Sequence, residues 1–451
     1  MESEGMNLLI NSTVLITVFI GACVLLLMYI IKLLNADQKN VEHKRKNEKL
    51  FEQTEKKKDS GASSKTKKKS SEPRWSGRSD KQSFSHPWLL TTLKGHTSQV
   101  LDMEFSSSGK YLASCGEDRA VLLWDTKDLT QKDHKSLRIN IEFDHPTFVK
   151  WSPDSKAFII HKYNANAIEV YKVEKKKDGW LGSATKALTF PKVHEEDAVG
   201  LGIACNGKFI MTCSNKTDLV VWDLRGQQLA RVDTYLMSTA CAKISPCGRF
   251  IVASGFAPDV KVWEVIFNKA GEYQEVKRVF ELTGHTSGVH DVAFDVDTSH
   301  MATVSKDGTW KLFDTKVDYK KGEDPHLKIT SKYEQTSRNA RIALSPNAEV
   351  VAIATWNSLS FYSTHTGRLD GTIENIFSGD ITSIMFDSLG KYLLVSGDKH
   401  IRVFHNVTGY RCEVATAKEK LKQNQTSATR ERLEKLICDN EAFLNRLGLK
   451  L

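Results

Sequence analysis

The sequence predicts an all-β protein, a seven-bladed β-propeller, with an apolar helix and a basic linker before it and a helical segment after it. Two observations carry this prediction. A strand–turn–strand pattern recurs seven times, at an average spacing of about 47 residues. Each copy is followed by a further β-rich run that contains an aromatic side chain, as expected for stacked four-stranded antiparallel sheets.

Residues 1–34 predict a membrane anchor. No charged residue occurs from Leu8 to Ile31, and this run is long enough to cross about 30 Å of hydrocarbon. Lys32 and five further Lys or Arg before residue 50 follow it, so the positive-inside rule places the N-terminus in the lumen or outside the cell and the propeller in the cytosol. A cleaved signal peptide is the alternative, but the apolar run is longer than usual and no small-residue cleavage site follows.

Residues 35–83 predict a solvated basic linker. They contain fifteen Lys or Arg and eight Asp or Glu, and so account for +7 of the formal net charge of +9. Lys and Ser are abundant and aliphatic residues are scarce, which is typical of a segment that forms no core. Contact of these lysines with anionic lipid is the alternative.

Residues 84–410 predict the propeller. In each copy a first strand ends at an apolar residue, and a turn of Ser, Pro, Asp, Asn or Gly leads to a second strand. The first strands end at Phe105, Trp151, Ile203, Ile244, Phe294, Leu344 and Phe386. The aromatics of the following runs are Trp124, Tyr171, Trp222, Trp263, Phe313, Tyr362 and Phe404. Residues 83–93 precede the first copy, and we expect them to pair into the last sheet and close the ring.

Two copies carry the same set of polar residues. The first has Gly95-His96, Ser114, Asp118 and Trp124, and the fifth has Gly284-His285, Thr303, Asp307 and Phe313. The Asp lies four residues after the Ser or Thr and six before the aromatic in both. In these residues the chain resembles the WD-repeat β-propellers. The resemblance implies that the His, the Ser or Thr, the Asp and the aromatic form a hydrogen-bonded tetrad in each of these two blades.

Other copies depart from this pattern. The third keeps Thr212 but has Lys216 where the Asp is expected, and the second and sixth are degenerate. Asp102 and Asp291, each six residues beyond the His of a complete copy, match another recurrent acidic position of the family. Because burial and period define the sheets, we expect the fold to tolerate the missing tetrads.

Residues 411–451 predict a C-terminal amphipathic helical tail with one apolar stripe. Its members are Leu433, Leu436, Ile437, Leu444 and Leu447. We expect the helix to dock on the side of the propeller. Binding of a partner or self-association is the alternative.

The sequence predicts neither an enzyme nor a bound cofactor, metal or small-molecule substrate. Residues 202–209, GIACNGKF, approach a phosphate-binding loop, but Phe209 stands where Ser or Thr would follow the Lys, and no helix follows. The eight cysteines are scattered without the spacing of a metal site. We interpret His96 and His285 as structural residues.

The predicted function is that of a scaffold for protein partners. The candidate contact residues lie where the chain enters the inner strands: Ser98, Gln99, Ser287, Gly288 and Asp380. The order of anchor, linker and propeller resembles WD-repeat proteins of the endoplasmic reticulum membrane. That resemblance implies a link to the stress response of this organelle, with a membrane-bound eIF-alpha kinase among the partners. The alternative is an RNA- or ribosome-associated module that uses the basic linker.

Overall fold

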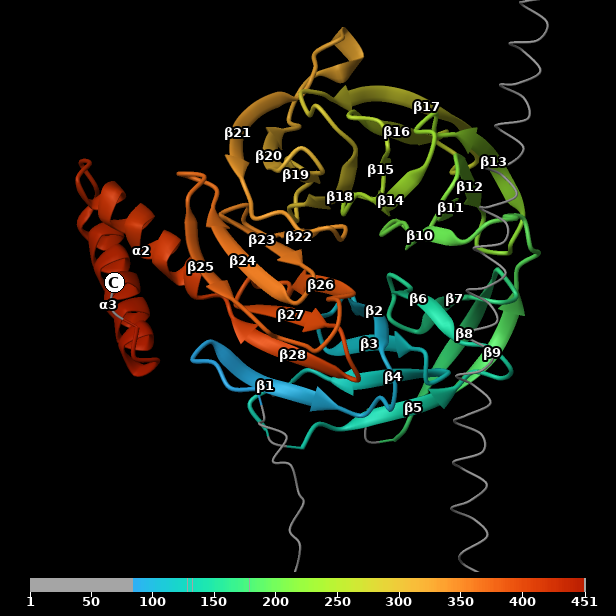
Figure 1. Cartoon of the computed structure of the whole chain (residues 1–451), viewed down its shortest axis with the longest axis horizontal. Coiled ribbons are helices and arrows are strands. Elements are labelled where there is room, and N and C mark those ends of the chain that lie inside the picture. The colour runs from blue at the N-terminus through green and yellow to red at the C-terminus, as the bar shows by residue number, and fades with distance from the viewer. Residues whose placement is uncertain (1–83, 128, 132, 178, 450–451) are drawn as a thin grey trace, which may run out of the picture. The chain divides into compact units, whose positions relative to one another are not determined.

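Seven four-stranded antiparallel sheets surround a common centre in the computed structural model of the chain (Figure 1). The structure describes residues 84–449 apart from 128, 132 and 178. The predicted anchor, residues 1–34, and the predicted linker, residues 35–83, lie outside these described residues. None of the helices in the described part of the chain is both long and apolar enough to cross a membrane. The predicted seven-bladed fold followed by a helical segment is confirmed.

Blades 1 to 3 are each formed by four consecutive strands. Blade 1 contains β2 (Val100–Phe105), β3 (Tyr111–Gly116), β4 (Ala120–Asp125) and β5 (Ser136–Asn140). Blade 2 contains β6 (Pro146–Trp151), β7 (Ala157–Lys162), β8 (Ala167–Lys175) and β9 (Leu181–Thr189). Blade 3 contains β10 (Ala198–Ile203), β11 (Ile210–Ser214), β12 (Asp218–Trp222) and β13 (Gln228–Asp233).

Blades 4 to 6 repeat this order. Blade 4 contains β14 (Thr239–Ile244), β15 (Phe250–Gly255), β16 (Val260–Phe267) and β17 (Tyr273–Leu282). Blade 5 contains β18 (Val289–Phe294), β19 (His300–Ser305), β20 (Thr309–Asp314), a single 3-10 turn η1 (Tyr319–Lys321) and β21 (His326–Lys332). Blade 6 contains β22 (Arg341–Leu344), β23 (Val350–Thr355), β24 (Ser358–Ser363) and β25 (Leu369–Ile373).

Blade 7 joins the two ends of the propeller. It contains β26 (Ser383–Phe386), β27 (Tyr392–Ser396), β28 (His400–His405) and, as its outer strand, β1 (Leu89–Lys94). β1 runs antiparallel to β28, with Leu89 opposite Phe404 and Lys94 opposite His400. The expectation that the segment before the first copy closes the ring is confirmed. This closure leaves no open gap between the first and last blades.

The repeated aromatics of the third strands form the core between blades. All seven are buried, and Phe404 is completely so. The second strands on which they pack are buried along almost their whole length, as in YLASCG of β3 and VVAIAT of β23. The alternation seen in the sequence is therefore that of sheets covered on both faces by neighbouring blades.

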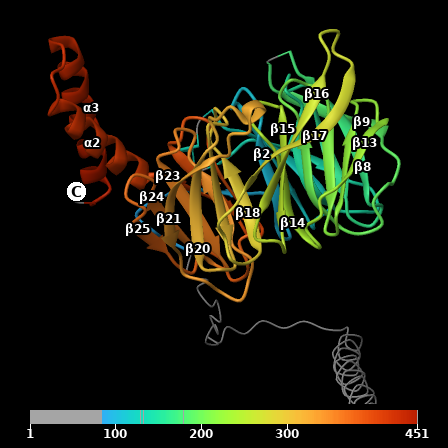
Figure 2. The same ribbon diagram turned by 90° about the horizontal axis from the view of Figure 1, so that it is seen from above.

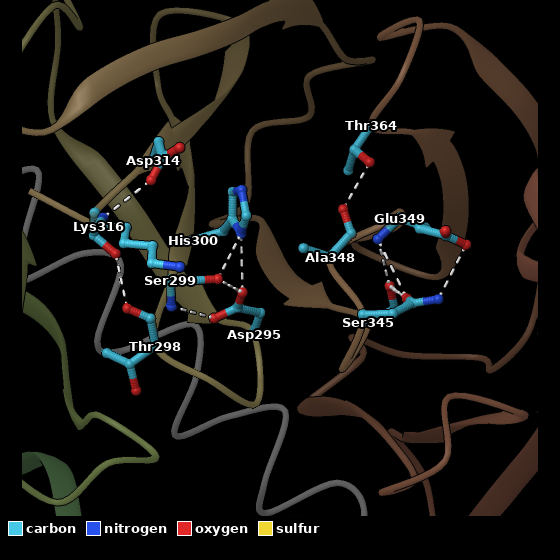
Figure 3. Close-up of polar contacts among 12 residues, drawn as sticks. Asp295, Thr298, Ser299, His300, Asp314, Lys316, Ser345, Ala348, Glu349 and Thr364 are labelled. Atoms are coloured by element: carbon cyan, nitrogen blue, oxygen red, sulfur yellow. Dashed lines mark hydrogen bonds and ion pairs between the residues drawn. The ribbon is translucent and has the colours of Figure 1, made fainter. Parts of the chain in front are cut away.

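The turn between the first and second strands is held by the side chain that follows the first strand. This side chain accepts a hydrogen bond from a backbone N–H four or five residues later. The residues in this position are Ser106, Ser152, Ser245, Asp295, Ser345 and Asp387, whereas blade 3 has Ala204. Figure 3 shows the Asp295 side chain accepting a hydrogen bond from the Ser299 N–H. It also shows a second local bond, in which the hydroxyl of Thr364, the residue after a third strand, donates to the Ala348 carbonyl at 2.7 Å. These local bonds explain why Ser, Asp and Thr recur at fixed places in the repeat.

Two helices follow the propeller where the sequence predicts one helical stripe. α2 (Val407–Leu421) begins behind the cap Asn406, whose side chain accepts from the Gly409 N–H, and it buries Cys412 and Val414. On the propeller, α2 contacts β23 and β24 at the rim of the ring (Figures 1 and 2).

α3 (Ser427–Arg446) packs on α2 and holds most of the predicted stripe. The Tyr410 and Phe443 rings lie 4.6 Å apart, and Leu444 is buried. Leu436, on the same stripe, is exposed. The Thr426 side chain accepts a hydrogen bond from the Thr429 N–H and so caps the start of α3. This cap marks the boundary between α2 and α3, which the spacing of the apolar residues does not reveal.

Candidate functional site

The candidate site is one end of the propeller, called here the top face. It consists of the connections from the outer strand of one blade to the inner strand of the next, and of the turns between second and third strands. Antiparallel order puts these two sets at the same end, and the remaining turns form the bottom face. The connections are 95–99, 141–145, 190–197, 234–238, 283–288, 333–340 and 374–382. The turns are 117–119, 163–166, 215–217, 256–259, 306–308, 356–357 and 397–399.

In blade 1 the four residues named from the sequence lie in one hydrogen-bonded chain. The Trp124 indole donates to the Ser114 hydroxyl at 2.9 Å. His96 lies 2.8 Å from that hydroxyl through Nε2 and 2.9 Å from Asp118 through Nδ1. Because the hydroxyl accepts from the indole, it can donate to Nε2, and Nδ1–H can then donate to the carboxylate. These hydrogen bonds hold the top-face connection that contains His96 on the sheet of blade 1.

Blade 5 has the same chain without its last member. His285 lies 2.8 Å from both Thr303 and Asp307. Phe313 is buried at the place of the indole but has no N–H to donate. The tetrad therefore ends at Thr303 in this blade.

Blade 3 contains a further tetrad that the sequence analysis missed. His194 lies 2.7 Å from Thr212 and 2.6 Å from Asp218, and the Trp222 indole donates to Thr212 at 2.9 Å. Lys216 occupies the expected place of the Asp, and Asp218, two residues later, supplies the carboxylate instead. The signal in the sequence was the separation of 18 residues between His and Ser or Thr, which all three blades share.

Burial and hydrogen bonding set the charges in these tetrads. Burial lowers the pKa of His194 and His285, which favours the neutral ring that the hydrogen-bonded chain requires. Burial alone would raise the pKa of Asp307, but hydrogen bonds from Thr309, the Thr286 N–H and His285 lower it to about 2. The carboxylate is therefore ionised and the ring neutral at pH 7.

Replacing Asp307 with asparagine is expected to lower the free energy of unfolding by about 2 kcal/mol at pH 7. The folded-state pKa lies below the ordinary value of 3.8, so the stabilisation is complete above pH 3.8 and is lost as the pH falls towards 2. Urea unfolding at pH 7 and at pH 2 measures this loss of stability. The control is Asp297→Asn, which changes an exposed residue of the bottom face. A loss of equal size at pH 2 would show that the charge of Asp307 is not the cause.

The inner strands surround a central cavity of about 630 Å³ that opens on the top face. Five inner strands carry a bulge after their first residue, and a bulge re-aims the extra side chain. The bulged residues Leu101, Thr147 and Val199 line this cavity. Three pairs of opposite charges lie in its lining: Lys150 lies 2.7 Å from Asp102, Lys243 2.7 Å from Asp291, and Arg338 3.1 Å from Asp380. Arg341, which also lines the cavity, forms no ion pair within the described residues.

Asp102 and Asp291 join neighbouring blades. Asp102 on β2 also accepts from the Val149 N–H on β6 at 3.2 Å. Asp291 on β18 takes the Lys243 ammonium from β14 and the Ile342 N–H, at 3.0 Å, from β22. These contacts are non-local, so the recurrent acidic position in the sequence did not identify its partners. Their arrangement is that of a structural brace with no unpaired carboxylate directed at a substrate.

A second cavity, of about 450 Å³, lies between blades 4 and 5. Ser287 and Gly288 line it, whereas Gln99 and Asp380 line the central cavity. Asn339 borders both cavities. Ser98 lies on the top face outside both and donates to Glu117 at 2.9 Å. The structure therefore places all five candidate residues on one face, in three separate positions.

The sequence analysis missed the most prominent feature of this face, its exposed aromatic side chains. All exposed aromatics of the described residues lie in top-face loops: Phe143, Tyr163, Tyr235, Phe256 and Trp356. Their exposed fractions run from 45% to 92%, and Met237 on the same face is 77% exposed. The bottom-face turns expose only aliphatic residues of this size, Leu224, Val296 and Leu389. Residues in loops do not follow the alternation of a strand. The only sign of these aromatics in the sequence was that they stand between the predicted strands.

The backbone holds several of these side chains in an unfavourable conformation. Phe143, Tyr235, Met237 and Trp356 have φ between 51° and 62°, in the left-handed region. A residue with a side chain adopts this region at a cost of about 1–3 kcal/mol, and such strain concentrates at functional sites.

No group of three or more His, Cys, Asp or Glu in the described chain is arranged to hold a metal ion.

Comparisons with known proteins agree with this architecture. The model of the WD domain, G-beta repeat, matches residues 87–125, 276–314 and 364–405, which end in blades 1, 5 and 7. Transducin beta-like protein 2 of Homo sapiens is 44% identical over 367 residues, which cover 81% of this chain and 82% of that protein. The Mus musculus protein of the same name is equally similar, over 83% of its length.

A more distant relative matches only part of the chain. The periodic tryptophan protein 2 homolog of Dictyostelium discoideum is 22% identical over 284 residues, 59% of this chain and 28% of that protein. The two mammalian relatives, by contrast, match over more than four fifths of their length. The chain belongs to the transducin beta-like protein 2 family of WD-repeat propellers.

Proposed function

We propose that this protein is a non-enzymatic scaffold that binds protein partners with the top face of its propeller. The observation that supports this most strongly is the gathering of every exposed aromatic of the described residues on that face. Aromatic residues and methionine are enriched at the centres of protein interfaces, where a few of them carry most of the binding energy. The three acidic residues that line the central cavity, Asp102, Asp291 and Asp380, are each held in an ion pair, and we nominate none of them for catalysis.

We propose further that the apolar run from Leu8 to Ile31 anchors the chain in the endoplasmic reticulum membrane, with the propeller in the cytosol. The absence of charge in that run and the Lys and Arg residues after it support this topology. The layout of the chain, which resembles anchored WD-repeat proteins of this organelle, supports a role in its stress response. The partner proposed on that basis is a membrane-bound eIF-alpha kinase.

The combined replacement of Phe143, Tyr235 and Trp356 by serine is expected to reduce partner capture by the full chain at least about tenfold. Proximity labelling in cells, followed by quantitative mass spectrometry, measures the capture. The matched control replaces Leu224, Val296 and Leu389 on the bottom face by serine, which removes three exposed apolar side chains. Equal capture by the top-face variant and the unchanged chain would overturn the proposed function.

Salt and a linker deletion separate this proposal from binding to RNA. A contact led by phosphates weakens steeply as salt rises, because bound counterions are released. A propeller-led complex is expected to survive both moderate salt and deletion of residues 39–81. Loss of capture under both conditions would favour the RNA- or ribosome-associated reading.

A further inference from the structure

The cavity between blades 4 and 5 is shaped to take an apolar side chain. Small residues form part of its lining, among them Ala240, Gly255 and Gly288. A Cβ at Gly288 would lie 2.8 Å from the Gly255 carbonyl oxygen, so blades 4 and 5 approach closely at these two glycines. The exposed Phe256 ring, 66% accessible, forms one wall. Its volume of about 450 Å³ lies within the range of ligand pockets, roughly 300–1,000 Å³.

The same cavity presents a hydrogen-bond donor. His290 is the bulged residue of β18 and lines the cavity. Its Nδ1 accepts a hydrogen bond from the Ala340 N–H at 3.1 Å. Burial, with Lys306 and Arg341 nearby, lowers the pKa of His290, so the ring is neutral and carries its proton on Nε2. Within the described residues, Nε2 makes no hydrogen bond.

Two cations beside the cavity are not held in an ion pair. Lys306 lines the cavity, and Arg341 lines the central cavity, whose lining also shares Asn339. Neither forms an ion pair in the part of the chain that the structure describes, whereas the neighbouring Arg338 is paired with Asp380. Both act electrostatically on His290, and Arg341 also acts on the buried Asp291. The Lys306 ammonium and the Arg341 guanidinium therefore keep hydrogen-bond donors for carboxylates of a partner.

We infer that the cavity between blades 4 and 5 receives a short peptide segment of a protein partner, with an apolar side chain in the cavity and adjacent carboxylates on Lys306 and Arg341. The small residues of its lining and the Phe256 wall suit the apolar side chain, and the unpaired cations suit the carboxylates. The Nε2–H of His290 is available to a backbone carbonyl of the segment. The inference rests on the proposed function and names the chemistry that this face recognises.

Fluorescence anisotropy of the full chain in detergent with labelled peptide libraries tests the inference. The probe library fixes Leu, Ile or Phe before an Asp-Glu pair; one matched library has Ala at the apolar position, and another has Asn-Gln at the acidic positions. The probe library is expected to bind at least about tenfold more tightly than either. Comparable binding of all three would overturn the inference.

Variants locate the binding. Phe256→Ala and Lys306→Glu are each expected to weaken binding of the probe library about tenfold, while Leu224→Ala and Lys110→Glu, both in bottom-face turns, leave it unchanged. Lys306→Glu is also expected to gain binding of a library with Lys-Arg in place of Asp-Glu, which a misfolded variant would not do.

The outcomes separate this inference from the proposed function. If the cavity variants leave peptide binding unchanged, or if no library binds, while partner capture still depends on Phe143, Tyr235 and Trp356, the inference fails and the proposed function stands. If capture is independent of those three residues as well, both fail.

Discussion

A chain that begins at Gly95 is expected to lose cooperative folding, whereas a chain that begins at Ser83 keeps it. The shorter chain lacks β1, so the backbone of β28 loses its partner and the ring opens at blade 7. It also lacks Trp88 and Leu93, both buried, and Trp88 packs against Phe361 with ring centroids 5.1 Å apart. Exposed strand edges of this kind pair with other chains and aggregate.

Urea unfolding followed by circular dichroism, with soluble yield, measures the effect. The chain from Ser83 serves as the control for loss of the N-terminal segment. A synthetic peptide of residues 84–94, added during refolding, is expected to restore part of the cooperative transition to the shorter chain. An unchanged unfolding midpoint for the chain from Gly95 would contradict the role of β1 in closing the ring.

Replacing Asp291 with alanine is expected to lower the free energy of unfolding by about 3 kcal/mol. The carboxylate is buried and accepts hydrogen bonds from Lys243, the Ile342 N–H and the Cys241 thiol, on the inner strands of blades 4 and 6. Burial alone would raise the pKa of Asp291, but Lys243 and Arg341 lower it, so the charged form prevails at pH 7. Its removal leaves these donors without their acceptor.

Chemical unfolding at pH 7 measures the loss, with Asp297→Ala on the bottom face as the matched control. The double replacement of Asp291 by alanine and Lys243 by methionine is expected to regain part of the stability, because it also removes the unpaired ammonium. A loss of about 0.5 kcal/mol or less, which is the range of ordinary surface substitutions, would show that Asp291 does not brace the blades.

The sequence predicts the blades well because their determinants are local and repeated. The third-strand aromatics and the apolar period recur within about 25 residues of one another in each copy, and six of the seven copies also have a Ser or Asp after the first strand. The pairing of β1 with β28 spans the whole propeller, yet it was predictable because an unpaired first strand and an open last sheet need each other.

The site was less predictable because its geometry is non-local. Asp102 finds its lysine on the following blade, and Asp291 on the preceding one, so a fixed position in the repeat has no fixed partner. The carboxylate of the blade 3 tetrad comes from Asp218, two residues after the position where the repeat has its Asp. In the sequence, only the constant separation between the His and the Ser or Thr indicates this tetrad. The exposure and left-handed backbone of Trp356 depend on the neighbouring loops.

Hydrogen–deuterium exchange of the full chain, with and without the partner captured in cells, shows directly whether the top face binds the partner. We expect the partner to protect the top-face segments 234–238, 256–259 and 306–308, whose amides lie around the exposed aromatics and the cavity between blades 4 and 5. Protection confined to the bottom-face turns or to α3, with the top-face segments unchanged, would contradict it.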